Sequence, residues 1–374
     1  MKLVIFGLTI SSSWGNGHAT VWRGLCCELA RLGHQIIFFE KNVAYYAAHR
    51  DFLDIPGGKL ILYDTWTEAL SPAQQHLADA DVAMVTSYCP DGIVAAELVL
   101  ASRPLKVFYD LDTPVTLERI ESGDGVDYIG ASGLRDFDIV LSFTGGRALM
   151  DLQSQLGAKR AVALYGSVHP DVHRRVAARE SYHADLSYIG TYAEDRQVTL
   201  NALFLEPARR LPKRRFLIAG AQYPPAFAWL PNLFFVRHIA PPDHPALYSS
   251  SRLTLNVTRR AMAQAGHCPS GRLFEAAACG TPIISDYWDG LETFFEPGEE
   301  ILVANQTADV LAALELSDEQ LGRIAGRARQ RAIEEHCAAK RARQLEAILE
   351  SVAADEPEPL AVAAEDCRVL RGEA

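Results

Sequence analysis

The stretch that decides the fold runs from residue 269 to residue 286 and reads PSGRLFEAAACGTPIISD. It predicts a helix with a marked start and end, followed directly by a buried strand. Pro269 and Ser270 stand where helices begin, Gly280 and Pro282 stand where they end, and two isoleucines then continue as a short apolar strand. Such a helix directs its free backbone N–H groups, and the positive end of its dipole, at whatever lies before Ser270.

Two charged side chains project from the first turns of this predicted helix. The guanidinium of Arg272 can bind phosphate oxygens, and the carboxylate of Glu275, one turn further along, can accept hydrogen bonds from a ribose diol. The alternative is an ordinary amphipathic helix whose Glu275 is merely solvated. The helix by itself does not separate these two interpretations.

The composition sets limits on the class of protein. A chain of 374 residues with 49% hydrophobic content can build two domains, each with its own core. The formal net charge of -11 and the absence of any Lys/Arg run argue against nucleic acid or an anionic membrane as the main partner. The seven cysteines form no C-x-x-C pair and have no histidine at metal-ligand spacing, which is typical of reduced thiols in a cytoplasmic protein. No segment approaches the roughly 18 apolar residues that a transmembrane helix needs.

Short apolar runs alternate with helical patterns along the chain, as in parallel sheets built from βα units. The alternation stops near residue 166 and then restarts, which predicts two successive series of strands. The first comprises residues 3–8, 35–39, 60–63, 82–86, 105–109, 139–143 and 161–165, and the second comprises residues 186–189, 215–219, 233–236, 253–257, 282–285 and 301–303.

The predicted fold class is therefore α/β, with two doubly wound Rossmann-like domains that face a cleft. We expect an N-terminal domain over residues 1–170 and a C-terminal domain over 171–335. A C-terminal helix over 336–352 is expected to cross back to the first domain, and residues 353–374 are expected to form a flexible tail. Ligands of such sheets gather at the carboxyl ends of the strands, so the site should lie in the cleft.

The first βα turn is the second informative stretch. Residues Trp14, Gly15, Asn16 and Gly17 precede His18, which stands where the first helix should begin. The glycines allow the backbone to approach a ligand closely, and an imidazole with an ordinary pKa near 6.5 can take a proton from a hydroxyl at neutral pH. The alternative is that His18 only caps the helix or hydrogen-bonds the loop.

The helix-and-strand stretch resembles the C-terminal half of GT-B glycosyltransferases, and the CgeB-like group is the nearest one. The resemblance rests on RLFEAAACGTPIISD at 272–286, DGLE at 289–292 and PGEEI at 297–301, and it extends well over residues 186–304. It implies that Glu275 binds the ribose of a nucleotide-sugar donor and that the turn of Ser270, Gly271 and Arg272 faces the diphosphate. Retaining relatives carry a second Glu eight positions earlier, where this chain has His267, so the resemblance favours inversion.

The Gly-Asn-Gly-His turn also resembles inverting GT-B enzymes, in which this loop contacts the acceptor. His18 is then the expected base. Asp110 and Asp112 follow a predicted strand and either orient His18 or act as the base themselves. They also spell Asp-x-Asp, which holds a metal ion in the other large glycosyltransferase fold, but they lie in the half without the donor-site helix.

Further donor-site candidates follow other predicted strands of the second half. Gly190 and Arg196 match a Gly followed by Arg in CgeB-like enzymes, and an arginine at 259 or 260 is expected to neutralise the diphosphate. The nucleobase is expected near His238. The complete donor set is Gly190, Arg196, His238, Arg260, Ser270, Gly271, Arg272, Glu275, Asp286 and Asp289, the last two near the sugar hydroxyls.

The sequence thus predicts a cytoplasmic hexosyltransferase that moves a sugar from a nucleotide-diphosphate sugar to a hydroxyl of an unknown acceptor, by inversion, without cofactor or metal. A nucleotide-sugar epimerase and a non-catalytic nucleotide-sugar binding protein remain as alternatives. An NAD-dependent enzyme does not fit. Glu40 stands where such a fold places its ribose ligand, but Thr20 occupies the last glycine position of G-x-G-x-x-G.

Overall fold

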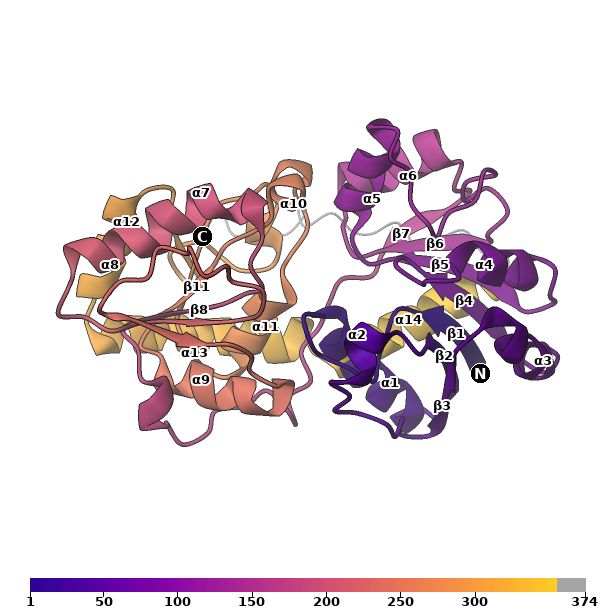
Figure 1. Cartoon of the computed structure of the whole chain (residues 1–374), viewed down its shortest axis with the longest axis horizontal. Coiled ribbons are helices and arrows are strands. Elements are labelled where there is room, and N and C mark those ends of the chain that lie inside the picture. Colours follow the sequence, from indigo (N-terminus) through magenta and orange to yellow (C-terminus); the bar gives the residue numbers. More distant parts are fainter. Residues whose placement is uncertain (355–374) are drawn as a thin grey trace, which may run out of the picture.

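Two parallel sheets, each covered by helices, lie side by side in the computed structural model, which describes residues 1–354 (Figure 1). The tail expected from residue 353 lies outside the described residues from position 355 onward, as does Cys367. None of the helices between residues 1 and 354 combines the length and the apolar character that a membrane crossing requires.

The first sheet has seven parallel strands in the order β3-β2-β1-β4-β5-β6-β7. Its central strands are buried on both faces, because separate apolar clusters cover the two sides, as continuous Val/Ile/Phe runs predict for a parallel sheet. Its strands are β1 (Lys2–Gly7), β2 (Gln35–Lys41), β3 (Gly58–Tyr63), β4 (Val82–Thr86), β5 (Leu105–Asp110), β6 (Ile139–Ser142) and β7 (Ala161–Ala163).

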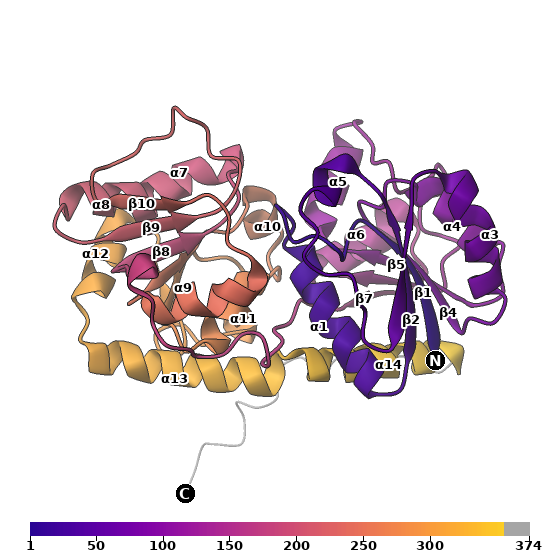
Figure 2. The same ribbon diagram turned by 60° about the horizontal axis from the view of Figure 1, so that its bottom comes forward.

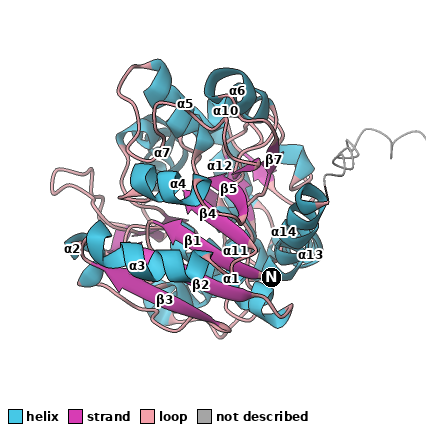
Figure 3. Ribbon diagram, turned by 90° about the vertical axis from the view of Figure 1, so that its right-hand side faces the viewer, coloured by secondary structure: helices cyan, strands magenta, loops and turns pink. Residues whose placement is uncertain are grey.

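Helices pack on both faces of this sheet, as the side view shows (Figure 3). The start of one of them is fixed locally, since Thr65 and Glu68 form a reciprocal capping box. The helices are α1 (His18–Arg31), α2 (Ala44–Ala47), α3 (Trp66–Leu77), α4 (Gly92–Leu100), α5 (Thr113–Glu121) and α6 (Arg147–Leu156).

The second sheet has six parallel strands in the order β10-β9-β8-β11-β12-β13. It is also buried between two apolar clusters. Its strands are β8 (Leu186–Ile189), β9 (Phe216–Ala219), β10 (Leu233–Val236), β11 (Thr254–Asn256), β12 (Ile283–Ser285) and β13 (Leu302–Val303). Its helices are α7 (Gln197–Leu200), α8 (Glu206–Arg210), α9 (His244–Ser250), α10 (Arg260–Ala265), α11 (Gly271–Ala278), α12 (Thr307–Glu315) and α13 (Asp318–Glu335), with a π-helical turn (Asn201–Leu205) and short 3-10 turns (Glu180–Tyr182, Glu194–Arg196, Pro241–Asp243 and Leu291–Thr293).

The chain crosses twice between the domains, and the two crossings are hydrogen-bonded to each other. Val168 of the first crossing donates to the carbonyl of His336 and accepts from the N–H of Ala338 in the second. The last helix, α14 (Ala338–Ala353), then packs on α1 of the first domain, with Leu345 and Leu349 in its core. Figure 2 shows α13 and α14 running end to end beneath the two domains.

The stretch quoted at the outset forms the expected helix and strand. Helix α11 begins after Ser270 and ends before Gly280, whose φ of +70° suits a residue without a Cβ. Strand β12 follows and lies inside the second sheet, between β11 and β13.

Candidate active-site cleft

A cavity of about 500 Å³ lies between the two domains, at the carboxyl ends of strands from both sheets. Its walls come from residues far apart in the sequence, including His18 and Asp112 on one side and Arg272 and Glu275 on the other. The domains also touch at its rim, because the rings of Trp14 and His238 lie 4.5 Å apart and Gln222 donates to the Tyr45 hydroxyl at 3.0 Å.

The N-terminal wall is a loop that a buried carboxylate holds in place. Glu40 is fully buried, and its Oε2 accepts the backbone N–H groups of Ile10 at 2.8 Å and Ser11 at 3.0 Å. Its other oxygen accepts the Ser11 hydroxyl. Glu40 therefore orders the loop ahead of α1, and it has no spare position for a ribose.

His18 faces a carboxylate across the start of α1. Its Nε2 lies 3.6 Å from Oδ1 of Asp112, and the Tyr88 hydroxyl donates to Oδ2 of the same carboxylate at 2.9 Å. The backbone N–H of His18 donates to the Asn16 side chain at 3.1 Å, which fixes where the helix begins. Within the described residues, Nδ1 of His18 is buried and has no hydrogen-bond partner.

The environment keeps Asp112 charged. Burial raises its pKa, but the nearby His18 and the Tyr88 hydrogen bond outweigh burial and hold the pKa below the usual 3.8. The Tyr88 phenol stays protonated, because burial and the Asp112 charge raise its pKa well above 10.0. The group is thus an imidazole beside an anchored carboxylate at the cavity wall, an arrangement that can accept a proton from a bound hydroxyl.

Asp110 does not share this position, which corrects the expectation that it serves the reaction. Its side chain is fully buried and does not line the cavity, and its Oδ1 accepts from the backbone of Asp112 and from the Thr116 hydroxyl, both at 3.1 Å. Burial raises the pKa of Asp110 to about 6. Asp110 is the last residue of β5 and Asp112 is the N-cap of α5, so the chain turns between them, the two carboxylates face different surroundings, and the Asp-x-Asp sequence does not form a pair of ligands.

The C-terminal wall is built on the start of α11. Ser270 precedes the helix with extended backbone and makes no side-chain cap, and a Cβ on Gly271 would meet nothing within 4 Å. No side chain within residues 1–354 caps the start of α11, and Ser270, Gly271 and Arg272 all line the cavity.

Glu275 lies one turn into α11, and its carboxylate is paired with histidine. Its Oε2 lies 3.2 Å from Nδ1 of His244, whose Nε2 lies 3.2 Å from the carbonyl of Ile239. Both ring nitrogens of His244 thus face acceptors. The fully buried His173 lies 3.9 Å from the same Oε2. Oε1 is left for a ligand in the cavity.

These neighbours fix the charge of Glu275. Burial raises its pKa, but the charge that His173 acquires in acid, together with the hydrogen bond and charge of His244, outweighs burial and lowers the pKa to about 2. For His173, burial has the largest effect and lowers the pKa to about 4, so at neutral pH this ring is uncharged. Glu275 is consequently an ionised acceptor that is held in one orientation.

Two arginines supply positive charge to the same cavity without a carboxylate partner among residues 1–354. Arg196 contacts only the Tyr188 hydroxyl and the Thr191 carbonyl, at 3.5 Å and 3.4 Å, and its Nε is buried and unpaired. Arg272 likewise makes no ion pair in that part of the chain. Arg259 lines the cavity too, but it is held by Asp195 at 3.3 Å. Unpaired guanidinium groups beside a helix N-terminus form an anion site.

Two backbone segments of the C-terminal wall approach each other closely beside the cavity. Gly190 and Gly220 follow neighbouring strands β8 and β9, and both line the cavity. A Cβ on Gly220 would lie 1.9 Å from the carbonyl oxygen of Gly190, so only glycine fits there. His238, the expected nucleobase contact, lines the cavity beside these loops and has its pKa lowered by burial.

Three expected donor-site side chains do not line the cavity. Arg260 is exposed, and only its backbone N–H is engaged, by Asp195 at 3.3 Å. Asp286 is turned inward, where its Oδ1 accepts from the backbone and hydroxyl of Thr258 and so ties the ends of β11 and β12 together. Asp289 is 82% exposed and lies near His267. Asp286 is thus used to hold the turns after β11 and β12, whereas the Arg260 and Asp289 side chains are exposed to solvent.

Most of the expected acceptor loop does line the cavity. Gly15, Asn16 and Gly17 line the cavity with His18, whereas Trp14 lies at its rim, stacked on His49 at 4.0 Å. His267, expected where retaining relatives have Glu, is also outside the lining. Its φ of +43° is unusual for a residue with a Cβ, and its carbonyl accepts the Gly145 N–H of the other domain at 3.0 Å.

Sequence reasoning missed Tyr88 and His244. Tyr88 lies two residues after the end of β4, so the rule that parallel strands deliver site residues at their carboxyl ends points to it. His244 begins a helix after Pro-Pro-Asp and carries no local signal of its contact with Glu275, which lies 31 positions away.

Two groups within residues 1–354 bring three potential metal ligands together. One is His173, His244 and Glu275 at the cleft, and the other consists of Cys27, Glu28 and His169 beside the first crossing. Neither group includes Asp110 or Asp112.

Comparisons with known proteins bear on the C-terminal half of the chain and on the fold. Residues 196–347 match the family model described as "Glycosyl transferase-like", which covers most of the C-terminal domain and extends into α14. No curated protein matches the chain in sequence.

Solved structures match almost the whole chain at low sequence identity. Sucrose-phosphate synthase from Thermosynechococcus elongatus has a TM-score of 0.69 and 13% identity, with 95% of this chain and 100% of that chain covered. Anabaena HepE in complex with UDP-glucose has a TM-score of 0.67 and 12% identity, with 94% and 100% covered. An alpha-glucosyltransferase in complex with UDP has a TM-score of 0.67 and 11% identity, again with 94% and 100% covered. The protein has the GT-B glycosyltransferase fold, with two Rossmann-like domains.

Proposed function

We propose that this protein transfers a sugar from a nucleotide-diphosphate sugar to an acceptor hydroxyl, with inversion at the anomeric carbon and without a metal ion. The observation that carries the proposal is the pairing, in one cavity, of an anion site next to an ionised Glu275 with the His18–Asp112 pair on the opposite wall.

The C-terminal wall offers complementary groups for the donor. Arg196, Arg272 and the start of α11 can neutralise a diphosphate, which must be stabilised when it leaves. The free oxygen of Glu275 can accept hydrogen bonds from a ribose diol. The family model matched at 196–347 and the UDP-glucose bound in HepE support a nucleotide-sugar donor, so UDP-glucose is the first donor to test.

The N-terminal wall offers a base for the acceptor. The His18 side chain is 21% exposed at the cavity, and its Nε2 is next to Asp112, which stabilises the imidazolium once a proton is taken. A base of this kind supports direct attack by the acceptor oxygen: its O–H proton goes to His18, the new glycosidic bond forms, and the nucleoside diphosphate leaves with the bonding electrons of the old one. One displacement inverts the anomeric centre.

The test starts with melting temperatures in the presence of UDP-, GDP- and dTDP-sugars, since a ligand that binds the folded state raises the melting temperature. The stabilising donor is then incubated with hydroxyl acceptors, and NMR assigns the anomeric configuration of the product. We expect an inverted product and the same rate with and without EDTA.

Each other result points to a different mechanism or function. A product that keeps the donor's configuration, or activity that EDTA abolishes and manganese restores, contradicts inversion or metal independence. A changed sugar still attached to its nucleotide indicates an epimerase, and binding without turnover against any acceptor indicates a non-catalytic nucleotide-sugar binding protein.

A further inference from the structure

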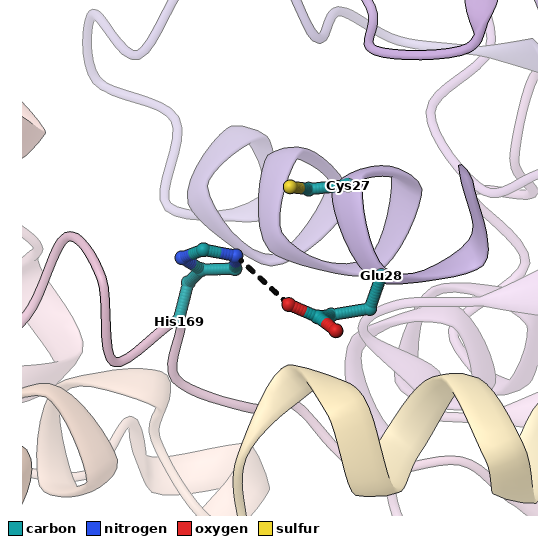
Figure 4. A group of neighbouring side chains, drawn as sticks. All are labelled: Cys27, Glu28 and His169. Carbon is teal, nitrogen blue, oxygen red and sulfur yellow. Dashed lines mark ion pairs between the residues drawn. The ribbon is translucent and has the colours of Figure 1, made fainter. Parts of the chain in front are cut away.

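A cysteine, a carboxylate and an imidazole converge where the first crossing between the domains passes α1 (Figure 4). Cys27 and Glu28 are adjacent on α1, and His169 comes from the crossing segment. Their ligand atoms all lie within 4.8 Å of one another, and Nε2 of His169 is 3.2 Å from Oε1 of Glu28. The site lies outside the lining of the cleft cavity.

The imidazole of His169 is buried and unsatisfied. Its side chain is 9% exposed, Nδ1 has no partner within residues 1–354, and Nε2 meets only the Glu28 carboxylate, without hydrogen-bond geometry. Leaving a buried polar group without partners is costly, so such a group calls for an explanation. Helix α1 comes close enough for contact because residue 24 is glycine: a Cβ there would lie 3.3 Å from the Cβ of His169.

We propose that these three side chains bind one divalent transition-metal ion of the zinc type, which fastens the crossing segment to α1. Sulfur, imidazole nitrogen and carboxylate oxygen are the ligand atoms that zinc takes in proteins, and three of them leave a fourth position for water. On binding, the metal–sulfur bond replaces the S–H bond of Cys27, and the proton passes to solvent.

The surrounding charges favour a cation. Thiolate and carboxylate supply two negative charges, and Asp171 of the crossing segment supplies a third next to them. Arg31 supplies one positive charge and contacts both Glu28 and Asp171. Because the Arg31 side chain is 55% exposed and its other amino group is held by Asp171, it can release Glu28 to a metal and keep its second partner.

The position of the site gives the ion a structural consequence. The crossing segment that carries His169 also carries His173, and the backbone N–H of His173 donates to the carbonyl of His169 at 2.8 Å. His173 in turn lies 3.9 Å from Glu275 in the cleft. An ion at His169 therefore fixes the segment that supports Glu275, without contacting substrate.

Cobalt(II) is the probe for this site, because its absorption reports the ligands and needs no turnover. Full-length protein, reduced and freed of metal with EDTA, is titrated with cobalt. We expect one equivalent of cobalt to produce a thiolate-to-cobalt charge-transfer band and visible bands as intense as those of tetrahedral cobalt. Zinc should displace the cobalt and remove both kinds of band. No charge-transfer band in the wild type overturns the proposal.

Variants assign the ligands. Cys27→Ser should abolish the charge-transfer band, and His169→Asn should weaken cobalt binding at least about tenfold. Cys337→Ser, which changes a thiol outside the group, and His244→Asn, which changes the cleft group, should both retain the band. Circular dichroism and melting curves check that each variant folds. A band that survives in Cys27→Ser, or disappears in His244→Asn, contradicts the assignment, and neither result bears on the sugar transfer.

Discussion

The two walls of the cleft each pair a carboxylate with an imidazole, but they hold the pair differently. On the N-terminal wall, Asp112 and His18 lie 3.6 Å apart, and one ring nitrogen has no partner within the described residues. On the C-terminal wall, Glu275 and His244 lie 3.2 Å apart, and the second ring nitrogen of His244 faces a carbonyl.

Because of this difference, His18 on the N-terminal wall can take up a proton, whereas Glu275 on the C-terminal wall keeps its negative charge. The His18 side chain is 21% exposed and lines the cavity, whereas His244 has acceptors at both ring nitrogens. The N-terminal pair suits a base and the C-terminal pair suits a permanent acceptor of hydrogen bonds. Similar residue types thus acquire different chemistry from the partners around them.

The largest effect should come from His18. Replacing it in His18→Ala should lower kcat by about 10²–10⁴, because the acceptor proton then has no base, while donor binding stays nearly unchanged. Turnover kinetics and donor calorimetry measure the two quantities. His183→Ala, which removes an exposed histidine outside the cleft, is the matched control. Full kcat in His18→Ala would reduce His18 to a residue that orders the loop.

Replacing the fixed acceptor should affect binding. Glu275→Ala should weaken nucleoside diphosphate binding by about 1–3 kcal/mol, the usual cost of a lost hydrogen bond to a charged group. Isothermal calorimetry measures the affinity, and Glu292→Ala, an exposed glutamate on the same domain, should leave it unchanged. If the affinity of Glu275→Ala equals that of the wild type, the ribose lies elsewhere.

The two walls should also differ in how pH affects stability. The pKa of His173 is lowered from 6.5 to about 4, so below pH 6.5 the unfolded chain binds a proton that the folded chain excludes. The free energy of unfolding should then fall by about 1.4 kcal/mol per pH unit from this residue as pH drops from 6.5 toward 4. Asp112 contributes no loss in this range, because its lowered pKa costs stability only as pH falls below 3.8.

Urea unfolding at a series of pH values between 6.5 and 5 measures this slope. Values below pH 5 are left out because Glu275, whose ordinary pKa is 4.5, begins to titrate there in the unfolded chain. His173→Gln should flatten the slope by that amount, whatever its effect on absolute stability, and His183→Ala provides the comparison. Identical slopes in His173→Gln and the wild type would mean that His173 is charged in the folded protein.

The smallest effect should come from the phenol that anchors Asp112. Tyr88→Phe removes a hydrogen bond of 2.9 Å to the charged Asp112, worth about 1.5–3 kcal/mol, but because Tyr88 acts on the base only through Asp112, turnover should slow only about 2–10-fold. The loss should appear in kcat and in the pH profile of kcat, with donor affinity preserved. Tyr182→Phe on the other domain is the control. A loss as large as that of His18→Ala would make Tyr88 part of the proton transfer.

Much of the fold was predictable because it depends on local patterns. The alternation of apolar runs and helical segments identified both sheets, and the helix signals at Ser270 and Gly280 gave the bounds of α11 almost to the residue. The C-terminal helix expected over 336–352 corresponds to α14, which is separated from α13 at His336 and Cys337, where the chain crosses between the domains. The contacts that hold this crossing, such as the pairing of Val168 with His336, are not recorded by any local pattern.

The sequence by itself determined the two-domain fold and the residues at helix starts, since periodicity, glycine and proline act over a few neighbouring positions. Only the tertiary structure decided which side chains share a site. It turned Asp110 and Asp286 inward, brought Tyr88 to Asp112 and His244 to Glu275, and placed His169 against Cys27 and Glu28. The physical reason is that a polar side chain takes its role from its partners, and here those partners come from distant parts of the chain.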